Sequence, residues 1–270
     1  MEFMEVEKTL IIPDIHGRTF WKKDTEAFLK SNENGIIVFL GDYLDPYEKE
    51  NIMPDDAIEN FKKIIEFKKE HIDNAVLLLG NHDLHYILYD FDECSRYDRW
   101  RAKRISFIFL DNISLFKMAF SITSGDKKFI LSHAGIQKNW VKEFFSDIDM
   151  KITDDNVVEF MNAQFDSIRT PLGAHSTTFP VKLDVMTPIR GGLFHKHGSM
   201  VWADFTEYLR PDTEIYGDFQ IFGHTIVKKP IIINNVACLD CMQSFILENG
   251  VIKYMDGTPV KIIEIKEDKK

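Results

Sequence analysis

Five short apolar runs in this sequence each end in a loop rich in glycine, aspartate, asparagine and histidine. Their β-branched and aromatic residues, without charge, predict buried strands. Ligands of open α/β sheets bind outside the carboxyl ends of the strands, so we expect the five loops to meet at one edge. The runs are residues 9–12, 36–40, 75–79, 129–131 and 219–222, and their loops read PDIHG, GDYLD, GNHD, SHAG and GHT.

Segments with helical spacing separate the strands and indicate an α/β fold. Pro54 suits the first turn of the second of these segments. Apolar strands that alternate with helices form sheets covered on both faces. Near the end, Asn249 and Gly250 lie between two further strands and signal a hairpin. The helical segments are residues 20–29, 54–71, 141–145 and 157–168, whereas residues 170–199 are expected to be irregular.

The composition excludes several classes of protein. A net charge of −10 is unsuited to non-specific nucleic-acid binding, which requires a basic face. No apolar run approaches the roughly 18 residues of a membrane span, and the acidic start of the chain is not a signal peptide. Three cysteines indicate a reducing compartment without a disulfide framework. We therefore expect a cytoplasmic protein that does not bind membranes.

The loops together carry the side chains of a metal site. One such loop alone is usually a turn, but five that all follow apolar strands and all carry metal-binding side chains predict a binuclear centre. Carboxylate, amide and imidazole groups suit Mn, Fe or Zn. The glycines allow the backbone to turn sharply beside these side chains.

These blocks resemble the calcineurin-like metallophosphoesterase superfamily, whose blocks read GDxHG, GDxxDRG, GNHE, HGG and GH. Within the superfamily, two features of this sequence most resemble the phosphoprotein (Ser/Thr) phosphatase branch. The last block lacks a second histidine after His224, and residues 89–96 resemble the YGFYDECxR stretch of that branch. The resemblance covers residues 9–247. It implies a four-layer αββα fold, a β-sandwich with helices outside.

The resemblance also implies a role for each site residue. Asp14 and His16 would hold a first divalent metal, and Asp42 would bridge it to a second. Asn81, His133 and His224 would hold the second metal. The two ions, expected to be Mn²⁺ with Fe or Zn as alternatives, would supply a bridging hydroxide that attacks the phosphate ester.

The general acid implied by the resemblance is His82, oriented by Asp45. Asn81 and a family arginine would contact the substrate phosphate. Pro46 stands where the family has the arginine of its DRG block, so one phosphate clamp is missing. For the second family arginine we prefer Arg190 to Arg210, because Arg190 lies in a glycine loop beside a basic run.

Two neighbouring features are expected to be structural. His85 is expected to pack against its surroundings. The other is a basic cluster, expected to be a solvated helical face that pairs with nearby acids. It consists of Arg96, Arg99, Arg101 and Arg104.

The sequence therefore predicts a metal-dependent phosphoric ester hydrolase, most similar to a phosphomonoesterase of the Ser/Thr protein phosphatase type. A nucleotide or dinucleoside-polyphosphate hydrolase, or a phosphodiesterase, is the enzymatic alternative. A non-catalytic scaffold is the alternative of another class, and it would have lost ligands that are all present here. The substrate would be a phosphorylated protein or small molecule. We expect one domain over residues 1–270, with a variable helical and loop segment at about 136–218.

Overall fold

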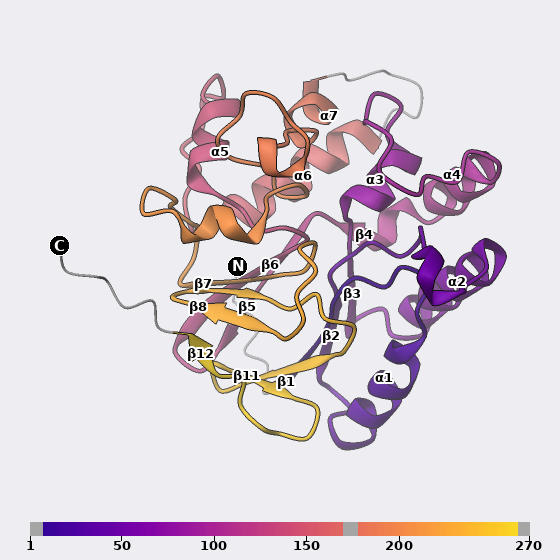
Figure 1. Cartoon of the computed structure of the whole chain (residues 1–270). Helices are drawn as coiled ribbons and strands as arrows, with labels where there is room; N and C mark the ends of the chain where they lie inside the picture. The colour runs from indigo at the N-terminus through magenta and orange to yellow at the C-terminus, as the bar shows by residue number, and fades with distance from the viewer. Residues whose placement is uncertain (1–7, 170–177, 264–270) are drawn as a thin grey trace.

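The computed structural model describes residues 8–169 and 178–263 and contains two mixed sheets (Figure 1). In the first sheet the strand order is β11-β10-β1-β2-β3-β4. Strands β1, β2, β3 and β4 are parallel, while β10 is antiparallel to β1. The bounds are β1 Lys8–Ile12, β2 Ile36–Phe39, β3 Ala75–Leu78, β4 Phe116–Lys117, β10 Phe245–Glu248 and β11 Val251–Tyr254.

The second sheet has the strand order β12-β8-β9-β7-β6-β5. Strands β6, β7 and β9 are parallel, so their carboxyl ends lie at one edge. The bounds are β5 Ala119–Ser124, β6 Lys127–Ser132, β7 Phe219–Phe222, β8 Ile231–Ile233, β9 Val236–Cys238 and β12 Ile262–Ile263. The predicted hairpin is present, because β10 and β11 pair across Asn249 and Gly250, both with positive φ.

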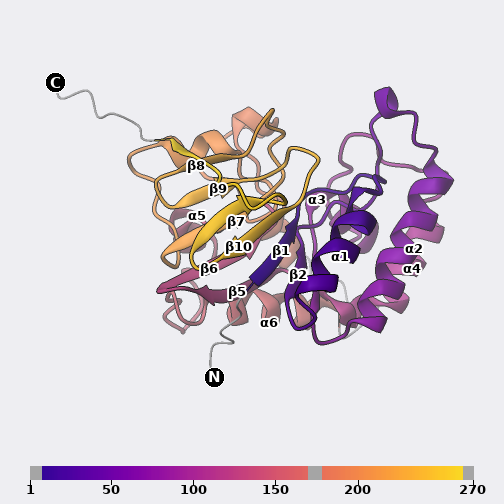
Figure 2. The same ribbon diagram turned by 90° about the horizontal axis from the view of Figure 1, so that it is seen from below.

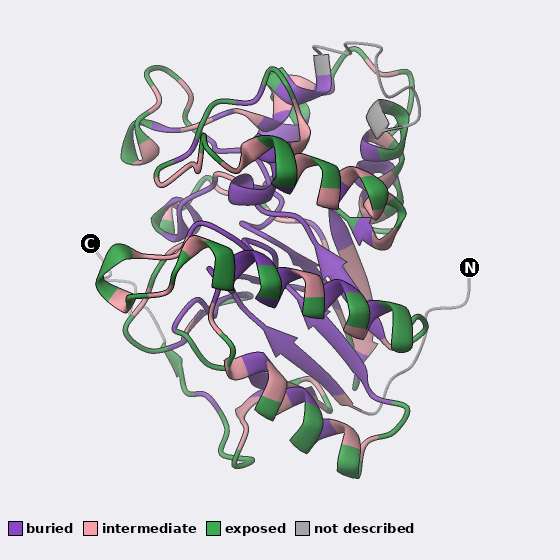
Figure 3. Ribbon diagram, turned by 90° about the vertical axis from the view of Figure 1, so that its right-hand side faces the viewer, coloured by how far each residue is buried: buried purple, intermediate pink, exposed green. Residues whose placement is uncertain are grey.

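The two sheets pack face to face through alternate residues of their strands. In β1, Ile11 belongs to the apolar cluster between the sheets, where it joins Phe129 and Ile221 of the second sheet. Leu10 and Ile12 point to the opposite face and join the cluster formed with the helices. Both faces of these strands are buried (Figure 3), which is why their sequences are continuously apolar rather than alternating.

Helices cover the outer faces of the sandwich. Helices α1, α2 and α4 lie together against the first sheet (Figure 2). Pro54 opens α2 as predicted, and the Phe61 ring of α2 stacks on Tyr43 at 5.2 Å. Helix α6 is tied to β5, because the Asn162 side chain accepts from Ala119 N–H and donates to its carbonyl. The helices are α1 Phe20–Ser31, α2 Pro54–Glu70, α3 Asn81–Ile87, α4 Ala102–Asp111, α5 Lys138–Phe144, α6 Val157–Arg169 and α7 Thr178–Leu183.

The predicted α/β sandwich with helices outside is therefore confirmed. The expectation of irregular structure at 170–199 was wrong for α7, where Phe179 and Leu183, four residues apart, bury one apolar face. Residues 170–177 lie outside the described residues. Four short 3₁₀ turns complete the described elements: Glu48–Glu50, Ile113–Leu115, Pro188–Arg190 and Phe205–Leu209. Within the described ranges, no helix is long and apolar enough to cross a membrane.

Candidate metal centre

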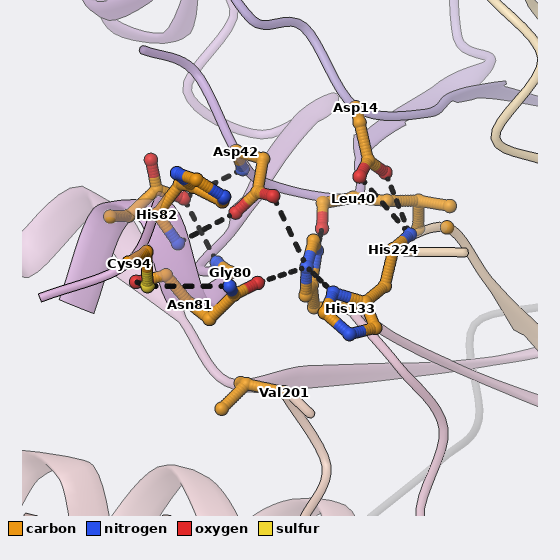
Figure 4. Close-up of polar contacts among 12 residues, drawn as sticks. Asp14, Leu40, Asp42, Gly80, Asn81, His82, Cys94, His133, Val201 and His224 are labelled. Atoms are coloured by element: carbon orange, nitrogen blue, oxygen red, sulfur yellow. Dashed lines mark hydrogen bonds and ion pairs between the residues drawn. The ribbon is translucent and has the colours of Figure 1, made fainter. Parts of the chain in front are cut away.

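The carboxyl ends of β1, β2, β3, β6 and β7 bring the predicted metal ligands together (Figure 4). Each ligand lies on the loop or the first helical residue after its strand. None is more than 8% exposed, so the predicted polar set is buried rather than a solvated surface cluster. The set is Asp14, His16, Asp42, Asn81, His133 and His224.

Asp42 lies at the centre of this set. Its Oδ2 atom is 3.5 Å from Nε2 of His16 on one side and 3.5 Å from Nε2 of His133 on the other. Its Oδ1 atom accepts the backbone N–H of His82 at 3.0 Å. One carboxylate therefore faces both halves of the cluster.

The surroundings of His133 bring lone pairs together. Its Nδ1 lies 2.9 Å from the Leu40 carbonyl, which can only accept, so Nδ1 carries the proton and Nε2 a lone pair. Nε2 lies 3.0 Å from Oδ1 of Asn81, another acceptor. Burial lowers the pKa of His133, which disfavours a second proton. An approach of two acceptors without a proton between them is the geometry that a cation stabilises.

His16 and Asp14 form the other half of the cluster. Nδ1 of His16 donates to the Leu44 carbonyl at 2.8 Å, which directs the Nε2 lone pair toward Asp42. Both oxygens of Asp14 accept the backbone N–H of His224, at 3.0 and 3.1 Å. The candidate ligands therefore form two groups, and within each group the ligand atoms lie within 4.8 Å of one another. One group is Asp14, His16 and Asp42, and the other is Asp42, His133 and His224.

The electrostatics of the cluster also favour cations. Burial and the neighbouring Asp42 raise the pKa of Asp14 to about 6, and burial raises the pKa of Asp42 well above its ordinary value. Burial lowers the pKa of His16 and His224 well below 6.5. Nε2 of His224 is buried without a hydrogen-bond partner. Buried carboxylates and neutral imidazoles with free lone pairs fit divalent metal ions.

The backbone is strained where it presents these groups. His16, Asp42, Asp45 and His224 all have positive φ, between 42° and 61°, although none is glycine. The Asp83 carboxylate stabilises the strained Asp42 loop, because it accepts the N–H groups of Asp42 and Tyr43 at 2.8 and 3.0 Å. Asp83 also accepts Gly80 N–H at 2.9 Å, so one side chain joins the loops after β2 and β3.

Asp45 lies beside His82, the residue that it is expected to orient. Oδ2 of Asp45 is 2.7 Å from Nδ1 of His82, and the aspartate is 3% exposed. The same oxygen is 2.9 Å from Nε2 of His85, and Oδ1 accepts the Tyr86 hydroxyl at 2.6 Å. His85 was expected only to pack against its surroundings, but it also contacts the Asp45 carboxylate.

His82, His85 and Cys94 form a third group with metal-binding atoms close together. Their metal-binding atoms already lie against other groups of the protein, since both histidines contact Asp45 and the Cys94 thiol donates to the Asn81 carbonyl at 3.4 Å. Burial raises the pKa of the Cys94 thiol, so the thiolate that a metal requires is disfavoured. We assign no metal to this group.

A cavity of about 810 Å³ opens above the cluster. His82 and His224 line it, while Asp14, Asp45 and His133 are buried and do not line it. Arg190 also lines the cavity, where its Nη2 pairs with Asp204 at 2.9 Å. The competing candidate, Arg210, lies outside this lining and donates to the Lys196 carbonyl.

The expected helical face of arginines was wrong for Arg96, Arg99 and Arg101, because only Arg104 lies in a helix. Helix α4 begins at Ala102, and Arg99, Arg101 and Arg104 form the predicted kind of surface ion pairs. Arg96 instead lies in the preceding loop and lines the cavity, 3.4 Å from Nε2 of His82. The difference arises from its left-handed backbone, with φ 66°.

The sequence analysis did not identify Asp240 as a buried carboxylate near the metal-ligand cluster. It is 3% exposed, and burial together with the nearby Asp14 carboxylate raises its pKa to about 8. It follows β9, whose carboxyl end lies beside that of β7. A polar residue after a short apolar run was the available signal, but β9 spans only Val236–Cys238 and was not predicted.

The chain is similar to a known protein family and to solved structures. A solved protein serine/threonine phosphatase from Saccharomyces cerevisiae, described as similar to human phosphatase PP5, is 16% identical with a TM-score of 0.49. The match covers 86% of this chain and 66% of that one. No curated protein matches the sequence. The calcineurin-like phosphoesterase profile matches residues 7–228, which is most of the chain and includes the five loops that carry the candidate ligands. With that match and the buried Asp and His cluster, the chain belongs to the calcineurin-like phosphoesterase family.

Proposed function

We propose that this protein is a binuclear-metal-dependent phosphoesterase that acts on phosphomonoesters. The observation that carries the proposal is the convergence of unprotonated atoms in the buried cluster. Nε2 of His133 meets Oδ1 of Asn81 at 3.0 Å, and both histidines beside Asp42 direct lone pairs toward it. This donor set suits Mn²⁺, with Fe or Zn as alternatives.

The ligands divide into two sites that share Asp42. In our proposal Asp14 and His16 hold one metal, while Asn81 and His133 hold the other with His224. Two divalent ions so placed, when bound, lower the pKa of a water molecule and neutralise phosphoryl oxygens. The complete donor set does not favour the scaffold alternative, for which the ligands would be free to change.

His82 is the residue we propose as general acid. Its Nδ1 is held by Asp45 at 2.7 Å, so Nε2 is the nitrogen that faces the cavity. A proton at Nε2 would be delivered to the oxygen of the departing alcohol, which otherwise leaves as an alkoxide. Asp45 fixes the ring and stabilises its charged form.

The segment at about 136–218 would determine which ester binds. Met186, Ile189 and Trp202 from this segment form part of the cavity wall, beside Arg190. In our proposal Arg190 and Asn81 contact the phosphoryl group, and the chain forms a single domain with this segment as its variable part. Because the wall is partly apolar and the cavity measures about 810 Å³, a nucleotide or polyphosphate ester is the second candidate substrate class.

A metal-reconstituted hydrolase assay tests the proposal. The chelated protein should not hydrolyse an aryl phosphate, and Mn²⁺ should restore turnover with about two metal equivalents bound. His133→Asn should abolish turnover, whereas His71→Asn, at the end of α2 and far from the cluster in the fold, should not. Full activity of the metal-free protein would contradict the proposal. A panel of phosphoproteins, nucleotides and small esters would then separate the two substrate classes.

A further inference from the structure

Pro46 leaves the cavity without the guanidinium that a DRG block would supply at that position. A phosphomonoester dianion needs compensating charge beyond its contacts with metals, and a guanidinium fork provides charge and directed hydrogen bonds together. The structure places another arginine beside the proposed acid. Nη2 of Arg96 is 3.4 Å from Nε2 of His82, and Arg96 lines the cavity that Asp42 and Asn81 also line.

The charge of Arg96 has no carboxylate partner, which distinguishes it from its neighbours. Among the residues that the structure describes, no carboxylate oxygen lies within ion-pair distance of its guanidinium. Arg18, Arg99, Arg101 and Arg104 all form such pairs. A guanidinium that lines a buried polar cavity without a counter-ion can bind an anion there without first breaking an ion pair.

The Arg96 side chain is held in place by contacts that leave its charge unneutralised. Nε donates to the Asp45 carbonyl at 2.9 Å, and Nη1 donates to the Ser95 hydroxyl at 3.0 Å. The guanidinium carbon lies 3.9 Å from the centre of the Tyr47 ring. Nη2 is left with only a weak contact to His82, so it is the atom available to a ligand.

Tyr47 joins this arrangement to the metal cluster. Its ring meets the His16 ring edge-on at 5.0 Å, while its face supports Arg96. It directly follows Pro46, so the same loop that lacks the arginine carries the ring on which Arg96 rests. Arg190 differs, because its Nη2 already binds both Asp204, at 2.9 Å, and the Thr225 hydroxyl, at 2.6 Å.

We infer that Arg96 binds a phosphoryl oxygen of the substrate in place of the arginine missing at Pro46, with Tyr47 as its positioning residue. The inference rests on the proposed function and specifies its substrate class as dianionic phosphomonoesters. A diester carries one charge less at the phosphoryl group and gains less from the unpaired guanidinium. Arg96 is therefore a determinant of monoester preference.

Phosphate binding measured without turnover tests this directly. Inorganic phosphate is titrated calorimetrically into the Mn²⁺-loaded protein and its variants. Arg96→Ala should weaken phosphate binding about 10- to 100-fold, the range for a charged hydrogen bond. Arg96→Lys keeps the charge but not the guanidinium fork, so its phosphate affinity should lie between those of Arg96→Ala and the parent protein. Arg99→Ala, three residues away and exposed with its partner Glu93, is the matched control and should bind phosphate like the parent protein.

The corresponding kinetic test compares an aryl phosphomonoester with its methyl diester. Arg96→Ala should lower kcat/KM for the monoester at least about tenfold more than for the diester, with two metals still bound. Tyr47→Phe should behave like the parent protein, whereas Tyr47→Leu should raise KM for the monoester several-fold, since only the ring face supports Arg96.

Unchanged phosphate affinity in Arg96→Ala would overturn the inference, and so would an equal loss for monoester and diester. Loss of metal in Arg96→Ala would also overturn it, because the residue would then be structural. If the parent protein binds phosphate through Arg96 but hydrolyses no ester, the inference stands and the proposed function fails.

Discussion

Nδ1 of His82 lies 2.7 Å from Oδ2 of Asp45, and that carboxylate also contacts His85 and the Tyr86 hydroxyl. Hydrogen bonds from His82 and Tyr86 and the close approach of His85 fix the orientation of this buried carboxylate, and therefore that of the His82 ring. Burial lowers the pKa of His82 to about 4, although the Asp45 bond opposes this shift. The proposed acid thus needs the added negative charge of a bound phosphate to favour its protonated form.

Replacement of His82 by asparagine should separate proton donation from metal binding. His82→Asn should retain two metals and lose about 10²- to 10⁴-fold in kcat for an alkyl phosphate, the usual contribution of a general acid. The loss should shrink for nitrophenyl phosphate, whose leaving group needs no proton. Equal losses across leaving groups would show that His82 is not the acid.

Replacement of Asp42 should change the number of metals bound. Asp42→Asn removes one negative charge from the position that faces both His16 and His133, so repulsion between two cations would be less compensated. We expect fewer than two metals per chain by elemental analysis, together with loss of turnover. Asp218→Asn is the control for loss of a carboxylate, because Asp218 precedes the amino end of β7 whereas the cluster lies at its carboxyl end. A variant with two metals and the parent rate would contradict the bridging role.

The sequence alone predicted the loops of the candidate site well, because each loop carries its own local signal. An uncharged apolar run predicts a buried strand, and the polar residues after it predict a ligand-binding loop at the edge of the sheet. The prediction requires parallel strands, and β1, β2 and β3 do pair in parallel. Helix α2 was predictable for the same local reason, since its apolar face recurs at helical spacing and Pro54 marks its start.

The site contacts that the local sequence pattern did not predict depend on tertiary packing. Arg96 reaches the cavity because its backbone is left-handed and because Tyr47, from a different loop, supports its guanidinium. His85 lies one helical turn after His82 and contacts the same aspartate, but spacing alone does not distinguish that contact from simple packing. Asp240 was missed because the strand before it has only three residues.

Metal binding should stabilise the fold. Burial, together with repulsion from neighbouring carboxylates, raises the pKa of Asp14, Asp42 and Asp240, so cations bound between them would relieve repulsion. Binding to the folded state at a concentration 100 times Kd contributes about 2.7 kcal/mol. Addition of Mn²⁺ to chelated protein should therefore raise Tm by at least about 5 °C. The Asp42→Asn variant should show a smaller rise, and an unchanged Tm in the parent protein would argue against the buried metal centre.

Gly223 should tolerate no side chain, because the Asp14 carboxylate occupies the space beside it. A Cβ atom at position 223 would lie 2.0 Å from Oδ1 of Asp14, so Gly223→Ala must displace that carboxylate. We expect loss of at least one metal and of turnover while circular dichroism still shows a folded protein. Gly257→Ala strains a left-handed turn but meets no atom within 4 Å, so it is the control for a glycine replacement and should keep full metal content. Normal metal content in Gly223→Ala would exclude Asp14 as a ligand.

Asp204 should limit the strength with which Arg190 binds phosphate. Its Oδ2 pairs with Nη2 of Arg190 at 2.9 Å, while its Oδ1 caps the turn that begins at Phe205 by accepting Thr206 N–H at 2.9 Å. Asparagine can keep the cap, since its carbonyl also accepts a hydrogen bond, but it removes the charge. Asp204→Asn should therefore leave the fold intact and free part of the Arg190 charge for a ligand.

A double variant tests whether stronger phosphate binding in Asp204→Asn depends on Arg190. Arg190→Ala should weaken monoester turnover by ~2–3 kcal/mol in kcat/KM, the scale of a charged hydrogen bond. Asp204→Asn alone should tighten inorganic phosphate binding about fivefold, roughly the 1 kcal/mol of a partly exposed ion pair. In Arg190→Ala/Asp204→Asn the gain should disappear, because no guanidinium remains to be released. If Asp204→Asn tightens phosphate binding equally with and without Arg190, Asp204 acts by general repulsion of the anion and Arg190 is not a phosphate ligand.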